Sequence, residues 1–147
     1  MGVQSISYSP EGDTIAAGCY NGKIHILDPV TVAVKRSLSG HNDSVRSVCF
    51  SHCGSKIVSG GGEAASWGNK DFSIRIWDTE TGTQIGSPLR GHNDPVWSLC
   101  FSPCGTKIVS GGGLGKHNGG NGDFSIRIWD AETGNQIGLP LSGHSDR

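Results

Sequence analysis

The sequence predicts an all-β fold in which a unit of four short strands occurs three times. Two dipeptides recur at nearly constant intervals: Gly-His at 40–41, 91–92 and 143–144, and Trp-Asp at 77–78 and 129–130. Before each Trp-Asp, apolar residues alternate with polar ones, which is the period-two pattern of a strand. Glycine supplies 24 of the 147 residues, about 16% against an average of about 7%, and this content destabilises helices.

Charge and hydropathy narrow the class of partner. The formal net charge is −1, whereas nucleic acids and anionic membranes are held by strongly basic surfaces. The longest apolar runs span a few residues, as at 56–58, far fewer than the roughly 20 that cross a bilayer. The sequence shows no charged start followed by an apolar stretch, so it does not indicate a secretory signal. We therefore expect protein or peptide partners, with no nucleic acid and no membrane.

The five cysteines are an odd number, unlike the even sets of secreted disulfide scaffolds. We interpret them as reduced thiols of an intracellular protein, in the cytoplasm with the nucleus as the alternative, rather than as disulfides or metal ligands. They are Cys19, Cys49, Cys53, Cys100 and Cys104.

The repeat divides the chain into units at 1–40, 41–91 and 92–147. Residues 71–94 match residues 123–146 at 19 of 24 positions, so the second and third units are near-copies of each other. The first unit is degenerate, and it has Leu-Asp at 27–28 where the other two have Trp-Asp.

Each unit is expected to contain four strands in succession. In the second unit these cover residues 45–50, 56–59, 73–77 and 84–89, and the Thr-Glu-Thr-Gly turn at 79–82 separates the last two. The same spacing places a first strand at the start of the chain, beginning at Val3, and a last strand over residues 136–141.

These paired dipeptides, in phase with a Ser-Pro-x-Gly-type turn and an Ile-Arg-Ile-Trp-Asp strand, resemble the WD-repeat (WD-40) family of β-propellers. The resemblance covers essentially the whole chain. It implies a partial β-propeller of three four-stranded antiparallel WD-repeat blades. It also implies an intracellular protein–protein interaction scaffold that is not an enzyme and uses no cofactor.

The family resemblance also assigns a structural tetrad, in which His, Ser, Asp and Trp side chains are joined by hydrogen bonds within a blade. A buried indole N–H needs an acceptor, a serine hydroxyl can accept and donate, and a neutral histidine can pass the chain on to a carboxylate. The tetrads carried over by position are His41, Ser59, Asp71 and Trp77 in the second unit and His92, Ser110, Asp123 and Trp129 in the third.

The same residue types could belong to a Ser-His-Asp hydrolase. Both serines lie in the segment Ile-Val-Ser-Gly-Gly, which lacks the glycine two residues before the serine that a nucleophile elbow requires. The set also occurs twice at the same spacing, as a scaffold element would. We therefore expect no catalytic, cofactor-binding or metal-binding residues.

The first unit departs from the tetrad. Ala17 stands in place of the serine, Asn21 in place of the aspartate and Leu27 in place of the tryptophan, and the histidine position would precede Met1. Losing all members together indicates a change to apolar packing, because a half-satisfied buried network is costly.

Two insertions, at 61–70 and 112–122, separate the second and third strands of the later units, and both are expected to be loops. In the family this loop lies on the top face, where partners commonly bind. Trp67 is either a partner contact or packed against its own blade. Lys116 follows Gly115 as in a phosphate loop, but the required first glycine and following Ser or Thr are missing, so Lys116 is kept as a candidate partner contact.

The second position of each first strand is a further candidate contact, because it changes while its neighbours hardly do. It is Gln4, Arg46 and Trp97 in the three units, and Arg and Trp are enriched at protein interfaces. Neutral drift at a solvated position is the alternative. Cys53 and Cys104 occupy the turn after the first strand, where the family usually has Asp, and are expected to be exposed.

Three blades are fewer than the four to eight of closed propellers. An open stack leaves two apolar faces in water. The chain is therefore expected to be part of a longer propeller, such as the sensor half of a signalling NTPase, or a protomer that assembles, so that two copies supply six blades. In that second interpretation the blades are structural and the loops are incidental.

Overall fold

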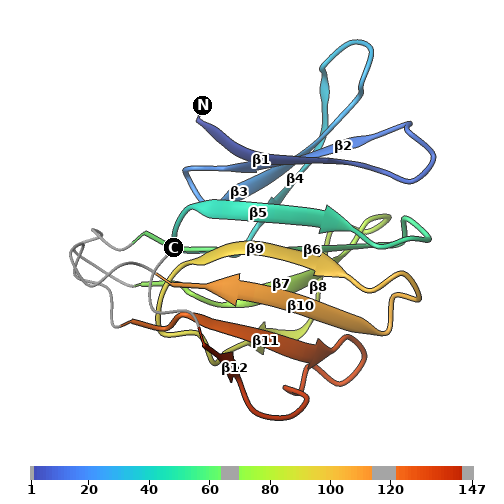
Figure 1. The fold of residues 1–147 in the computed structure, drawn as a ribbon. Coiled ribbons are helices and arrows are strands. Elements are labelled where there is room, and N and C mark those ends of the chain that lie inside the picture. Colours follow the sequence, from blue (N-terminus) through green and yellow to red (C-terminus); the bar gives the residue numbers. More distant parts are fainter. Residues whose placement is uncertain (1, 64–69, 114–121, 144–147) are drawn as a thin grey trace.

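The structure, a computed structural model, describes residues 2–63, 70–113 and 122–143. These residues form three four-stranded antiparallel sheets and no helix (Figure 1). The all-β class and the three four-stranded units expected from the repeat are confirmed.

Strands follow one another in sequence order across each sheet, so neighbouring strands are joined by hairpins. Sheet one contains β1 (Val3–Tyr8), β2 (Ile15–Cys19), β3 (Lys23–Leu27) and β4 (Val34–Ser39). Sheet two contains β5 (Val45–Phe50), β6 (Lys56–Gly61), β7 (Ile74–Asp78) and β8 (Gln84–Leu89). Sheet three contains β9 (Val96–Phe101), β10 (Lys107–Gly112), β11 (Ser125–Asp130) and β12 (Leu141–Ser142).

The hairpins between third and fourth strands close on an aspartate. In sheet two the Asp78 carboxylate accepts hydrogen bonds from the backbone N–H groups of Glu80 and Thr81, at 2.9 and 2.8 Å. Gly82 completes the turn with φ of 73°, a conformation that a side chain disfavours. The aspartate of the Trp-Asp dipeptide is thus a turn residue.

One expected strand is largely absent. The strand predicted over residues 136–141 is reduced to Leu141–Ser142 and an isolated bridge between Gln136 and Trp129. Its counterpart β8 ends in Leu89, which is 4% exposed within a cluster that includes residues of sheet three, whereas Leu141 is 57% exposed. The prediction was wrong because it treated the two segments as equivalent. β8 packs beside sheet three, whereas no described sheet follows β12.

The sheets are stacked in sequence order, with β5 packed against β1 and β2, and β9 packed against β5 and β6 (Figure 1). Two apolar clusters fill the two junctions between sheets. The first joins residues of sheets one and two, including Ile24, Leu38, Val48 and Trp77. The second joins sheets two and three. The core therefore lies between sheets, as in repeat architectures.

The stack has two edges that differ in character. The loop edge carries the connections between sheets, at 40–44 and 90–95, and the described ends of both insertions. The turn edge carries the tight hairpins, such as residues 51–55 and 79–83. Within the described ranges there is no helix long and apolar enough to cross a membrane.

Candidate functional site

The four tetrad positions of sheet two lie together near its loop edge. Trp77 Nε1 donates to Ser59 Oγ at 2.7 Å, and His41 Nε2 lies 2.8 Å from the same oxygen. His41 Nδ1 faces Asp71 Oδ2 at 3.3 Å. Burial would raise the pKa of Asp71, but the adjacent His41 ring and the hydrogen bonds from Ser73 and the Asn42 N–H hold the pKa of this carboxyl far below its usual value.

The corresponding positions of sheet three have the same arrangement. Trp129 Nε1 donates to Ser110 Oγ at 2.8 Å, and His92 Nε2 lies 2.8 Å from that oxygen. His92 Nδ1 lies 3.0 Å from Asp123 Oδ2. Burial lowers the pKa of His92 although the Asp123 carboxylate opposes this shift, so the ring favours its neutral form.

Sequence reasoning missed the second layer of this network. In sheet two, Arg75 Nη1 donates to Gln84 Oε1 at 2.7 Å, and Arg75 Nη2 lies 3.3 Å from Asp71 Oδ2. In sheet three, Arg127 makes the matching bond to Gln136 at 2.8 Å. The signal was present, because both the arginine and the glutamine recur in the two near-identical units.

Sheet one fills these positions differently. Ala17 is 2% exposed at the serine position. His25 pairs across to Ala17 in the strand register, at the place of Arg75, and its Nδ1 lies 2.7 Å from Ser37 Oγ. Asn21 accepts a turn hydrogen bond from the Lys23 N–H at 3.2 Å.

The two serines of these networks are closed off from solvent. Ser59 is 0% exposed and Ser110 is 1% exposed. Each oxygen also accepts an indole N–H, which a nucleophile would have to release. The arrangement fits a network that fixes the loops at the ends of the strands.

Two of the variable first-strand residues meet each other across the junction between sheets two and three. The Arg46 guanidinium carbon lies 4.3 Å from the centroid of the Trp97 ring, a cation–π geometry. Arg46 Nε also donates to the Gly62 carbonyl at 2.6 Å, and its Nη2 lies 2.8 Å from Glu63 Oε2. Gln4, at the same position of β1, is exposed and is not part of this pair.

The ring of Trp97 is anchored to the second insertion. Its Nε1 donates to the Gly113 carbonyl at 2.7 Å, and the residue is 37% exposed. Arg46 and Trp97 thus each bind the backbone where an insertion begins, and they form a fixed aromatic and cationic surface at the loop edge. We call the residues Arg46, Glu63 and Trp97 the Arg–Trp surface.

A small pocket of about 90 Å³ lies at the same edge, where the end of the first insertion approaches the connection to sheet three. Lys70 and Arg90 line it together with Phe72, and both cations are exposed. Two cationic groups that line one pocket form a suitable site for a carboxylate of a partner.

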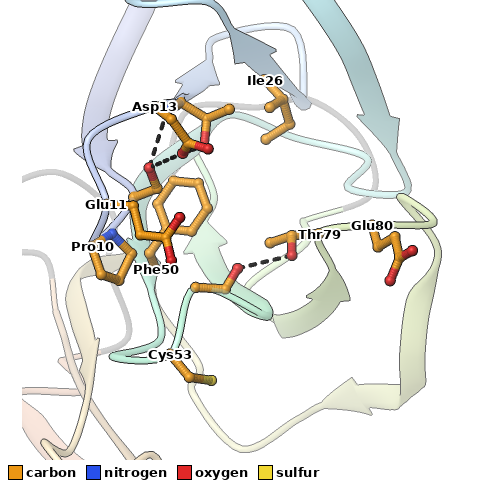
Figure 2. Close-up of a pocket in the computed structure, with 11 residues that line it drawn as sticks. Pro10, Glu11, Asp13, Ile26, Phe50, Cys53, Thr79 and Glu80 are labelled. Carbon is orange, nitrogen blue, oxygen red and sulfur yellow. Dashed lines mark hydrogen bonds between the residues drawn. The ribbon is translucent and has the colours of Figure 1, made fainter.

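A larger hollow, of about 260 Å³, lies at the turn edge between sheets one and two (Figure 2). Three carboxylates line it, from Glu11, Asp13 and Glu80, together with the ring of Phe50 and the thiol residue Cys53. No sequence pattern indicated this hollow, because its residues come from separate turns of two sheets.

Two exposed thiols lie in the first turns of sheets two and three, where the sequence placed them. Hydrogen bonds from the Ser55 and Ser51 hydroxyls lower the pKa of Cys53 to about 7. In sheet three, Ser102 and Thr106 lower the pKa of Cys104 to about 7 in the same way. By contrast, burial raises the pKa of the Cys19 thiol.

Two other predicted contacts, Trp67 and Lys116, lie outside the described residues. In the part of the chain that the structure describes, no group of three or more His, Cys, Asp or Glu side chains is placed to hold a metal ion.

Comparison with known proteins gives a consistent result. The family model "WD domain, G-beta repeat" matches residues 1–28, 33–78 and 82–130. The chain is 30% identical over 99 residues to the Set1 complex component swd1 of Schizosaccharomyces pombe, and 34% identical over 98 residues to the human WD repeat and SOCS box-containing protein 1. Each of these matches covers 67% of this chain and 22% of the relative.

A third relative aligns over nearly the whole chain. It is the guanine nucleotide-binding protein subunit beta of Solanum tuberosum, 26% identical over 150 residues, which cover 98% of this chain and 36% of the relative. The chain thus spans between about a fifth and a third of the length of these relatives.

Proposed function

The chain belongs to the WD40 repeat family, and we propose that it is a non-catalytic scaffold that binds protein or peptide partners at its loop edge. The names of the relatives support the general role, because one is a component of the Set1 complex and another is a subunit of a guanine nucleotide-binding protein. The partner class expected from the charge, without nucleic acid or membrane, and the intracellular location are parts of the same proposal.

The Arg–Trp surface is the observation that carries the proposal. Trp97 is 37% exposed although it is held by the Gly113 carbonyl and by the Arg46 guanidinium. A fixed, partly exposed tryptophan loses little conformational entropy on binding and offers a large apolar area, which is why tryptophan and arginine dominate binding hot spots.

The pocket of Lys70, Phe72 and Arg90 specifies the partner further. Its two cations favour an acidic side chain, and a volume of about 90 Å³ suits one carboxylate group. We expect the bound segment to combine an apolar residue that packs on Trp97 with an acidic residue that enters this pocket.

Peptide display tests this proposal even though the natural partner is unidentified. A random peptide library on phage is selected against the full chain, and the affinities of the selected peptides are measured by fluorescence polarisation. We expect peptides that contain acidic residues, with Trp97→Ala weakening binding by about tenfold or more. Salt should weaken binding to the wild type and have a smaller effect on a Lys70→Ala, Arg90→Ala double variant.

The matched control is Val30→Ala, at a position 88% exposed on the turn edge, which should leave the affinity unchanged. Circular dichroism of each variant verifies the fold. Selected peptides that bind Trp97→Ala and the double variant as tightly as the wild type would remove the loop edge as the binding surface.

A further inference from the structure

The two junctions inside the chain are built from the same contacts. In each, a first strand places three apolar side chains against the preceding sheet. Val45, Val48 and Phe50 of β5 are 0, 5 and 8% exposed against sheet one. Val96, Leu99 and Phe101 of β9 are 0, 6 and 8% exposed against sheet two. The junction is thus a repeated interface with defined requirements.

A glycine provides the space for this first strand. A Cβ on Gly18 would lie 2.8 Å from Val45 Cγ1, and a Cβ on Gly60 would lie 2.8 Å from Leu99 Cδ2. Both distances are shorter than real Cβ contacts, so the absence of a side chain is what admits the incoming strand.

A serine hydroxyl fixes the position of the incoming strand along the preceding sheet. The Val48 N–H donates to Ser5 Oγ at 3.2 Å, and the Leu99 N–H donates to Ser47 Oγ at 3.1 Å. In both junctions the acceptor is the third residue of one first strand, and the donor is the fourth residue of the next.

On its outer face sheet three has the same glycine and serine, but no described first strand packs against them. We call this face the Gly111 face, or the receptor. Gly111, the counterpart of Gly60, would have nothing within 4 Å of an added Cβ. Ser98, the counterpart of Ser47, is exposed, and Val109 is 36% exposed. A hollow of about 230 Å³ lies here, lined by Ser98, Val109, Gly111 and Ile126 among others.

The opposite end of the stack presents the complementary strand. Val3, Ile6 and Tyr8 of β1 stand at the positions of the three buried side chains of β5 and β9, and they are 53, 67 and 60% exposed. They form an exposed apolar row along β1, which is an edge strand of sheet one at one end of the stack (Figure 1). Such a row on a sheet surface marks an interaction site.

We propose that two copies of this chain bind end to end, with β1 of each copy on the Gly111 face of the other. Ile6 enters the space above Gly111, and the Ile6 N–H donates to Ser98 Oγ of the other copy. Two such contacts use both ends of both copies and close a ring of six sheets, as heterologous contacts do when the rotation closes. The occupant is a second copy because β1 carries the apolar pattern and spacing that both internal junctions use.

Sedimentation and light scattering of the full chain test this contact. The wild type should have a mass of twice 15.4 kDa. Ile6→Glu places a charge on the inserting strand, and Gly111→Val fills the receptor without a clash inside the copy that carries it. Each variant alone should lose the dimer and have the mass of a single chain.

Mixing the two variants separates a specific contact from general stickiness. Ile6→Glu retains an intact receptor and Gly111→Val retains an intact β1, so an equimolar mixture should form a one-to-one pair through its single intact contact. Ser87→Glu, which places the same charge at an exposed position of β8 in the middle sheet, should dimerise as the wild type does.

Circular dichroism distinguishes loss of contact from loss of fold, and recovery in the mixture requires both variants to be folded. A wild type that is monomeric up to high micromolar concentration would overturn the proposal, as would oligomers larger than a pair. Failure of two folded variants to pair on mixing would overturn it equally.

Discussion

Sheets two and three have nearly the same sequence but differ on one face. On the face that points to the following sheet, Val58 is 0% exposed in sheet two, whereas its counterpart Val109 is 36% exposed in sheet three. Leu89 and Leu141 differ in the same way, at 4 and 57%. The residues are identical, and the difference comes from the presence of a neighbouring sheet.

The tryptophans and serines on the face that points to the preceding sheet show no such difference. Trp77 and Trp129 are both 2% exposed, and the serines that accept their indole N–H groups are equally buried. A repeat of this kind thus encodes its strands and internal hydrogen bonds locally, while the burial of its apolar faces depends on the next unit.

Truncating each of the two leucines to alanine should give the largest difference in stability between sheets two and three. We expect Leu89→Ala to lower the free energy of unfolding by about 2–5 kcal/mol, because it leaves a cavity in the junction between sheets two and three. Leu141→Ala, at an exposed position, should cost less than about 1 kcal/mol. Urea denaturation followed by tryptophan fluorescence measures both.

These measurements belong in the Ile6→Glu background, so that association between copies does not bury Leu141. Equal losses for the two leucines in that background would show that Leu141 is covered within a single chain and that the two faces do not differ as described.

Truncating each of the two serines to alanine should, by contrast, destabilise the chain by the same amount. Ser59→Ala removes the acceptor of the Trp77 indole N–H and the partner of His41 Nε2. Ser110→Ala does the same to Trp129 and His92. Leaving buried polar groups unsatisfied costs about 1–3 kcal/mol, and both variants should fall in this range by urea denaturation.

Sheet one supplies the reverse test. Ala17 already occupies the serine position, where Leu27 replaces the tryptophan donor, so Ala17→Ser should destabilise rather than stabilise the chain. Ser142→Ala, at an exposed position, is the control and should have little effect. A large difference between Ser59→Ala and Ser110→Ala would show that the hydrogen bonds also depend on the neighbouring sheet.

Sequence reasoning succeeded where the signal is local. The strands predicted at 45–50 and 84–89 have the expected bounds. The strand that alternation predicted over 73–77 is β7 (Ile74–Asp78), because alternation reflects the two faces of a single strand. It failed at residues 136–141, because the length of the strand there depends on a neighbour that no local pattern records.

The candidate site residues also divide into those that a local signal predicts and those that depend on a junction between sheets. The resemblance named the His, Ser, Asp and Trp positions, and the structure brings them within contact of one another in sheets two and three. The variable positions Arg46 and Trp97 were singled out separately, but 51 residues and a sheet boundary separate them. Their stacking is therefore a property of the junction, which the sequence does not display.

The first turns of sheets two and three provide the smallest and most local comparison. Cys53 Sγ lies 2.9 Å from Ser55 Oγ, and Cys104 Sγ lies 2.9 Å from Thr106 Oγ1, so each thiol contacts a hydroxyl of its own turn. Because the pKa of both thiols is lowered to about 7, about half of each is thiolate at pH 7. Both should react with iodoacetamide several-fold faster than Cys19, whose pKa is raised by burial.

Peptide mapping by mass spectrometry after brief labelling measures each site separately. The rates at Cys53 and Cys104 should be equal within about a factor of two and should fall together as the pH drops from 8 to 6, because protonation removes the nucleophile. Ser55→Ala should slow the alkylation of Cys53 and leave that of Cys104 unchanged, while Thr106→Val should do the reverse.

Because neither turn needs a following sheet to form these hydrogen bonds, a strong difference between the two wild-type rates would mean that the turns also depend on their neighbours. In that case the carboxylates lining the hollow beside Cys53 are the groups that differ, and Glu11→Gln and Glu80→Gln should restore the equality.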